Sequence, residues 1–305
     1  NWDIMKETEE AEEEAPDDTT KAGGFQLALK RFAISDANIV YDDRQGNVFA
    51  EISNMNYSLK GDFTEDFTDL ETELQIEKLT AKSGGIKYLN NSSIGFMAML
   101  EADLKNSKFT IHENFFKINE LELGLNGWVE MPDDNIDMDV KFEVKKADFK
   151  ELLSLVPVVY KKDFESVKTS GKLALHGFAK GKFNSEKEIL PEFNLTLIVE
   201  NAMFKYPDLP EAADNININL VVKNKGGSPD MTIADLDKFH VELAGNPVDL
   251  QFNLKTPVSD PEIKGKITSD LDLTKLKNVI PLEDTELKGQ IKRSEERRVG
   301  KECAT

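Results

Sequence analysis

Apolar and polar residues alternate with a period of two along most of this chain, from residue 25 onward. Leu121, Leu123 and Leu125 stand at every second position of one such segment. The same pattern recurs at 27–29, 140–144, 173–175, 193–199, 216–222 and 250–254. Because successive side chains of a strand point to opposite faces, each segment predicts a strand with one apolar face and one polar face.

Short segments rich in Gly, Pro, Asn and Asp separate these strands, which favours antiparallel hairpins. They are 43–47, 60–62, 83–85, 132–135, 224–228 and 259–261. We count about fifteen strand candidates by these signals. The prediction is therefore a mainly β fold, in which an elongated, twisted and curled antiparallel sheet is built from repeated strand modules and forms an apolar groove.

Two short helices are predicted between strands, at about 148–156 and 272–280. Asp148 and Asp272 are suitable N-cap residues, and a proline follows each segment and helps to end it. The apolar residues expected to face the sheet are Phe149, Leu152, Leu153, Val156, Leu273, Leu276 and Ile280. We expect both helices to cover one edge of the apolar sheet face.

The two helical segments also resemble each other, which indicates an internal repeat. A second similarity relates 36–43 to 201–208, and weaker ones relate 109–111 and Gly127 to 231–233 and Gly245. We therefore predict a first β module at 25–182 and a second, truncated module at 183–292. Repetition on this scale favours a function that belongs to an extended surface.

Both ends of the chain differ from this pattern. Residues 1–24 are predicted to be a disordered acidic linker, because the first eighteen contain nine acidic residues and one lysine. Residues 293–305 resemble, residue for residue, the translation of a common high-throughput sequencing adapter, and we interpret them as non-native. The native portion would then lack Cys303, the only cysteine of the chain.

Composition and charge limit the possible partners. The 305 residues have a net charge of −19, which makes a nucleic-acid partner or non-specific docking on anionic lipid headgroups unfavourable. No apolar run approaches the roughly 20 residues of a membrane-spanning helix. The chain starts at Asn1 without a methionine, so we expect a fragment.

We find no pattern typical of an enzyme or of a cofactor site. His112, His176 and His240 lie on different predicted strands and are interpreted as exposed strand residues. The pairs Asp137/Asp139 and Asp133/Asp134 offer oxygen ligands for calcium, but a solvated turn explains them more simply. The expectation is a protein without a catalytic residue, a metal site or a cofactor.

Three segments resemble the AsmA family of Gram-negative bacteria, especially its Bacteroidetes members: 32–43, the helix at 148–157, and the glycine-bracketed strand at 169–181. The similarity covers about residues 25–292. It implies a periplasmic body that an N-terminal helix, absent from this sequence, anchors in the inner membrane. It also implies a relationship to TamB-like and other bridge-like lipid-transfer proteins, and a role in outer-membrane lipid homeostasis and assembly.

A wide sheet with one apolar face requires a cover, because large exposed apolar patches are rare without a partner. We hypothesise that phospholipid or other acyl chains lie in the groove. The candidate lining residues are Leu121, Leu123, Leu125, Phe193, Leu195, Leu197, Ile216, Ile218 and Leu220. The same residues would be ordinary core in a closed sandwich. A non-enzymatic scaffold or assembly factor for outer-membrane proteins is the alternative function, and an extracellular adhesin is a weaker third.

Overall fold

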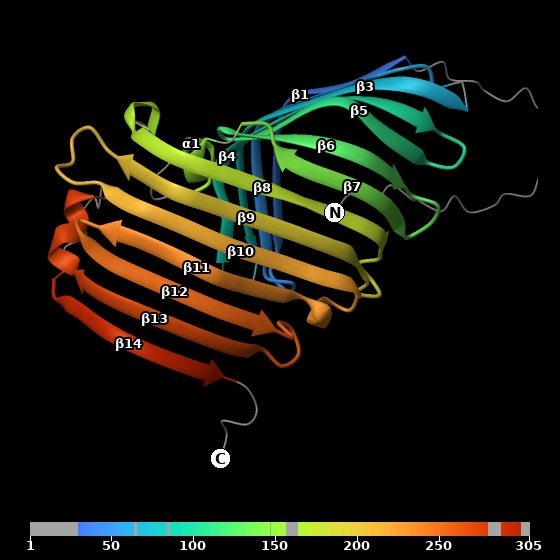
Figure 1. Cartoon of the computed structure of the whole chain (residues 1–305). Coiled ribbons are helices and arrows are strands. Elements are labelled where there is room, and N and C mark those ends of the chain that lie inside the picture. The colour runs from blue at the N-terminus through green and yellow to red at the C-terminus, as the bar shows by residue number, and fades with distance from the viewer. Residues whose placement is uncertain are drawn as a thin grey trace, which may run out of the picture.

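A computed structural model of the chain describes residues 30–63, 66–83, 86–146, 148–156, 164–279 and 288–299. This part forms one antiparallel sheet of fourteen strands, whose spatial order is the order of the sequence (Figure 1). The strands are β1 (Arg31–Asp43), β2 (Val48–Lys60), β3 (Phe67–Ser83), β4 (Ile86–Asp103), β5 (Lys108–Ile118), β6 (Leu121–Glu130), β7 (Ile136–Val144), β8 (Lys168–Phe183), β9 (Leu190–Lys205), β10 (Ala213–Gly227), β11 (Ile233–Leu243), β12 (Asn246–Lys255), β13 (Glu262–Asp272) and β14 (Gln290–Val299). The predicted mainly β, antiparallel fold is confirmed.

Helices are few and short in the described part of the chain. They are α1 (Phe149–Leu153) and the 3₁₀ helices η1 (Phe164–Ser166), η2 (Pro229–Met231) and η3 (Leu273–Asn278). None of them has the length and apolar character that crossing a bilayer requires.

The two predicted helices are present, each with its predicted N-cap. The Asp148 carboxylate accepts a hydrogen bond from the Lys150 N–H at 2.9 Å, and Asp272 accepts one from the Thr274 N–H at 3.0 Å. Both helices are shorter than predicted, and the second is a 3₁₀ helix. Its Thr274 and Asn278 are poor helix formers, and short 3₁₀ segments are common in such sequences.

Not all of the predicted inward-facing helix residues are covered. Phe149 and Leu153 are buried, Leu152, Leu273 and Leu276 are half-buried, and Val156 is 37% exposed. Ile280 and the two prolines lie outside the described residues. Val279, which sequence reasoning did not select, is fully buried instead.

The sheet is strongly curled, and its first strands run at a steep angle to β8–β14 (Figure 1). Register shifts interrupt the strand pairs at several points, among them β1 with β2 and β9 with β10. Residues near these shifts adopt positive φ, including Asp36, Asn54, Asn201 and Asn215. Such bulges add a residue to one strand and increase the local bend and twist, which provides curvature at defined positions.

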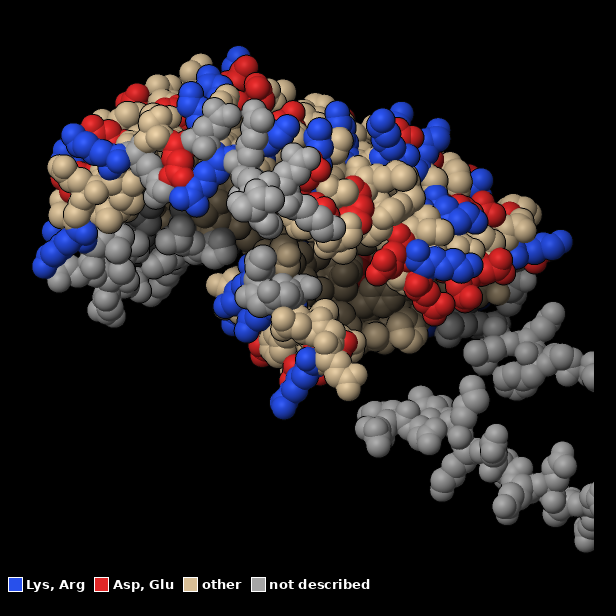
Figure 2. Space-filling model, turned by 90° about the horizontal axis from the view of Figure 1, so that it is seen from below, with Lys and Arg blue, Asp and Glu red and all other residues tan. Residues whose placement is uncertain are grey.

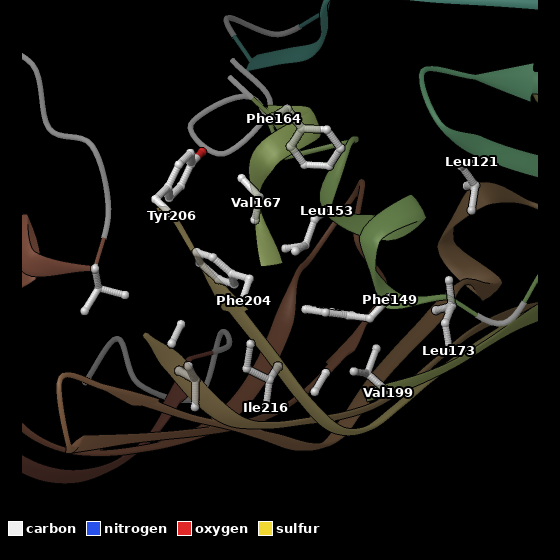
Figure 3. Close-up of a cluster of buried hydrophobic side chains, with 14 of the residues drawn as sticks. Leu121, Phe149, Leu153, Phe164, Val167, Leu173, Val199, Phe204, Tyr206 and Ile216 are labelled. Carbon is white, nitrogen blue, oxygen red and sulfur yellow. The ribbon is translucent and has the colours of Figure 1, made fainter. Parts of the chain in front are cut away.

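The main buried cluster lies at one end of the strands, where α1 and η1 pack on the sheet (Figure 3). Phe149 and Leu153 of α1 and Phe164 of η1 meet sheet residues that include Val199 and Ile216. α1 contacts β6, β8 and β9. The expectation that this helix covers one edge of the apolar face is confirmed.

The weaker repeat matches do not occupy equivalent places. Gly127 lies within β6, whereas Gly245 lies in the turn between β11 and β12. At the ends, 293–299 form most of β14 and pair with β13. The predicted linker at 1–24 lies outside the described residues.

Candidate functional site

The strand register places the alternating apolar residues on one face across the whole sheet. In antiparallel pairs, directly opposed residues lie on the same face. One row crosses β1–β7 through Ile34, Tyr57, Leu74, Phe96, Phe116, Leu123 and Val144. A second crosses β6–β13 through Leu125, Phe142, Gly177, Leu195, Val222, Ala234, Leu254 and Ile263. We call this side the apolar face.

The paired positions of β2–β13 on the apolar face contain no Lys, Arg, Asp or Glu. Figure 2 shows a recess between two parts of the molecule whose visible lining is mostly uncharged, whereas charged side chains occupy much of the surrounding surface. The described residues form a single sheet, and no second sheet packs on this face as in a closed sandwich.

All nine candidate lining residues lie on the apolar face, but their cover differs. Leu121 and Ile216 are buried in the cluster beneath α1, and Leu123, Leu197 and Ile218 are half-buried against it. The other four, Leu125, Phe193, Leu195 and Leu220, are half-buried beyond that cluster. The structure thus divides the set into five residues in or against the packed cluster and four half-buried residues beyond it, which we call the uncovered portion because they lie outside the cluster beneath α1.

Polar contacts hold α1 over the packed end. The Asn119 side-chain amide donates to the Ser154 carbonyl at 2.7 Å, and the Glu120 N–H donates to Ser154 Oγ at 3.1 Å. The Glu151 side chain turns inward, is only 6% exposed, and accepts from the Glu122 N–H at 3.3 Å. Burial raises the pKa of the Glu151 carboxyl, against the opposing effects of that hydrogen bond and of Lys146.

An open cavity of about 660 Å³ lies on the apolar face near the C-terminal edge of the sheet. β12 and β13 form most of its wall with alternating apolar side chains, and Gly265 lies between them. Its lining residues are Leu250, Phe252, Leu254, Ile263, Gly265, Lys266, Ile267, Ile291, Glu295 and Arg297.

β14 breaks the apolar pattern. Glu295 opposes Ile267 and Arg297 opposes Gly265, so charged residues stand at positions that are apolar or glycine in β13. Both belong to the segment that resembles a sequencing adapter. We therefore define the candidate site by residues before 293.

The opposite face of the sheet carries cross-strand ion pairs. Asp139 pairs with Lys180 at 3.0 Å and Asp137 with Lys182 at 3.6 Å, so each carboxylate of this pair faces a lysine of β8. Among the described residues, no group of three or more His, Cys, Asp and Glu side chains is arranged to hold a metal ion.

His240 is less exposed than its sequence position suggested. Its Nδ1 lies 2.7 Å from Asp249 Oδ1, and its Nε2 lies 3.8 Å from Glu242 Oε1, with 19% of the side chain exposed. The turn between β11 and β12 aligns His240 with Asp249. The two-residue turn Ala244-Gly245 fixes the hairpin register. Recognising this turn in the sequence would have predicted that His240 and Asp249 lie opposite each other.

Comparison with family models, with curated proteins and with solved structures gives no match to this chain.

Proposed function

We propose that the uncovered part of the apolar face binds lipid acyl chains, and that the protein supports phospholipid transport and outer-membrane homeostasis and assembly. One observation carries this proposal: apolar positions continue in register through β2–β13, while α1 covers only one end of the strands. Such a face favours an apolar partner, because its side chains beyond the cluster are only half-buried and contiguous exposed apolar surface is rare on isolated soluble domains.

The chemistry of the face fits a partner that moves along it. Burying a methylene contributes about 0.8 kcal/mol without regard to direction. A chain shifted by one strand, about 4.8 Å, meets the same kind of surface. Since the paired positions of β2–β13 on this face carry no charged side chain, no ionic anchor there resists such a shift.

The proposed place of action rests on the resemblance to the AsmA family. The segment 32–43 forms most of β1, and the glycine-bracketed segment 169–181 lies in β8, beside α1. We accordingly propose a periplasmic protein attached to the inner membrane through a segment outside this sequence. Outer-membrane assembly proteins are further proposed partners.

The test begins with lipid extraction and native mass spectrometry of the purified protein. We expect phospholipid to accompany it. Lipid-free protein that instead binds an outer-membrane folding factor would favour the scaffold function.

A variant that introduces a charge on the apolar face tests whether lipid binds there. Leu195→Glu places a carboxylate between Gly177 and Val222, beyond the cluster beneath α1, and is expected to abolish lipid retention. Leu197 is a poorer choice because it packs against that cluster. The control is Asn194→Glu, on the other face and opposite Lys223, which is expected to retain lipid. Equal retention by both variants, with both folded, would contradict the proposal.

A further inference from the structure

Gly265 contributes no side chain to the floor of the cavity over β12 and β13. Gly265 opposes Phe252, and the adjacent pairs on the same face are Leu254 with Ile263 and Leu250 with Ile267. These four aliphatic side chains stand around the glycine, so the floor of the apolar face is lower at this point. Ile291 adds an apolar wall from β14.

The size of this cavity fits one hydrocarbon chain. Its volume, about 660 Å³ with Ile291, Glu295 and Arg297 of β14 included in the wall, lies within the roughly 300–1,000 Å³ of small-ligand pockets. From Leu250 to Leu254 it extends over four residue steps, or about 13 Å along a strand. One lipid monolayer occupies about half of a hydrocarbon core of roughly 30 Å, so an acyl chain has a similar length.

The charge of the lining indicates how such a chain is attached. Two cations are among the lining residues: Lys266, which the register places on the opposite face, and Arg297, which pairs with Glu295. The apolar-face residues of β12 and β13 offer no cation to a buried carboxylate, and burial of an unpaired charge is very costly. The polar end of the ligand therefore has to remain in water. This favours the acyl chain of a phospholipid, whose headgroup stays outside, over a fully inserted free fatty acid.

We propose that the cavity over Gly265 is a subsite for a single acyl chain of a phospholipid. This rests on the proposed function of the apolar face and assigns it a defined position. The assigned residues are Leu250, Phe252, Leu254, Ile263, Gly265 and Ile267, all of which precede residue 293.

Gly265→Val fills the subsite without straining the strand. A Cβ at this position would lie 3.5 Å from the Gln251 carbonyl oxygen and 3.7 Å from Phe252 Cβ, which are ordinary contacts. Valine also favours a strand more than glycine does. We expect the variant to fold and to project its methyl groups into the cavity.

Gly95→Val is the matched control, because it makes the same change on the opposite face. Gly95 pairs with Gln75 and Lys117, and its neighbour Phe96 points to the apolar face. A Cβ there would lie 3.6 Å from Phe115 Cε1 and 3.9 Å from Lys117 Cβ.

The experiment uses the full chain and phosphatidylethanolamine with a diazirine near the end of one acyl chain. After photolysis, peptide mapping locates the label and titration gives the affinity. We expect labelling in 248–267 of the unchanged protein. We also expect about tenfold weaker binding for Gly265→Val, equivalent to about 1.4 kcal/mol, and unchanged binding for Gly95→Val.

Each of the other possible results contradicts one specific claim: the subsite, the phospholipid assignment or the proposed function. If the unchanged protein binds the probe but is labelled elsewhere, or if Gly265→Val binds as well as Gly95→Val, the subsite is wrong and the proposed function stands. If a diazirine fatty acid labels 248–267 and the phospholipid does not, the phospholipid assignment is wrong. If neither probe binds the unchanged protein, the proposed function itself fails.

Discussion

Asp36 and Asn201, 165 positions apart in the sequence, occupy the same place in two copies of one structural corner. Each adopts positive φ, at 51° and 48°, and each donates its backbone N–H to an asparagine of the next strand at 3.2 Å. The acceptors are Asn56 Oδ1 and Asn217 Oδ1. The similarity between 36–43 and 201–208 therefore marks a repeated backbone geometry.

Loss of either acceptor is expected to destabilise the protein by a similar amount. Asn56→Ala and Asn217→Ala each leave a bulge N–H without its protein acceptor, which costs about 1 kcal/mol. The two corners are eight strands apart, so the effects should add in the double variant. Urea unfolding measures both effects, and Asn219→Ala, on β10 but away from the corner, serves as the control. A double variant no less stable than either single variant would show that the corners do not act separately.

The packed and uncovered portions of the apolar face should respond differently to truncation. Phe149 of α1 is 3% exposed, so Phe149→Ala is expected to cost about 3–5 kcal/mol. Phe193 lies on the same face but beyond the cluster, and Phe193→Ala is expected to cost much less because water already reaches it. Chemical denaturation of both variants provides the comparison. Equal losses would mean that this part of the face is packed as fully as the end beneath α1.

The buried Glu151 carboxyl makes stability depend on pH. Its pKa is raised in the folded protein, so the folded state binds more protons than the unfolded state between the ordinary and the raised pKa. The stabilising contribution of the neutral form is complete below the ordinary carboxyl pKa and is lost as pH rises through the raised value. Glu151→Gln has no such titration. The stability of the unchanged protein relative to this variant should fall as pH rises, and a difference independent of pH would contradict the assignment.

Divalent cations should leave the stability unchanged. Asp137 and Asp139 form the acidic pair that could supply oxygen ligands to calcium. They face Lys182 and Lys180 across β7 and β8. These partially exposed ion pairs contribute at most about 1 kcal/mol each. Thermal unfolding with calcium and with a chelator should give the same midpoint. A calcium-dependent rise that Asp139→Asn abolishes would reveal a cation site at this pair.

The alternation of apolar residues was sufficient to predict the strands and their apolar face. Leu125 and Phe142, for example, fall on one face in the structure as the period of two predicts. The N-cap roles of Asp148 and Asp272 were also predictable, since a cap depends on a local hydrogen bond.

Features that depend on strand pairing were not predictable from the same pattern. Ile216 and Ile218 look like successive positions of one uninterrupted strand. A bulge on β9 nevertheless shifts their partners from Ala202 to Val199. The cavity over Gly265 likewise requires the register of β12 with β13. A glycine in an alternating segment does not reveal which side chains surround it.

The two corners at Asp36 and Asn201 have a consequence for how the sequences of proteins with this fold diverge. If curvature depends on a few backbone positions, and the inward residues need only be apolar, most side chains of the sheet are free to change in evolution. Distant relatives would then preserve the spacing of positive-φ corners and the alternation between them, while pairwise identity decays. A search that scores bulge spacing and hydropathy period is better suited to such chains than residue-by-residue alignment.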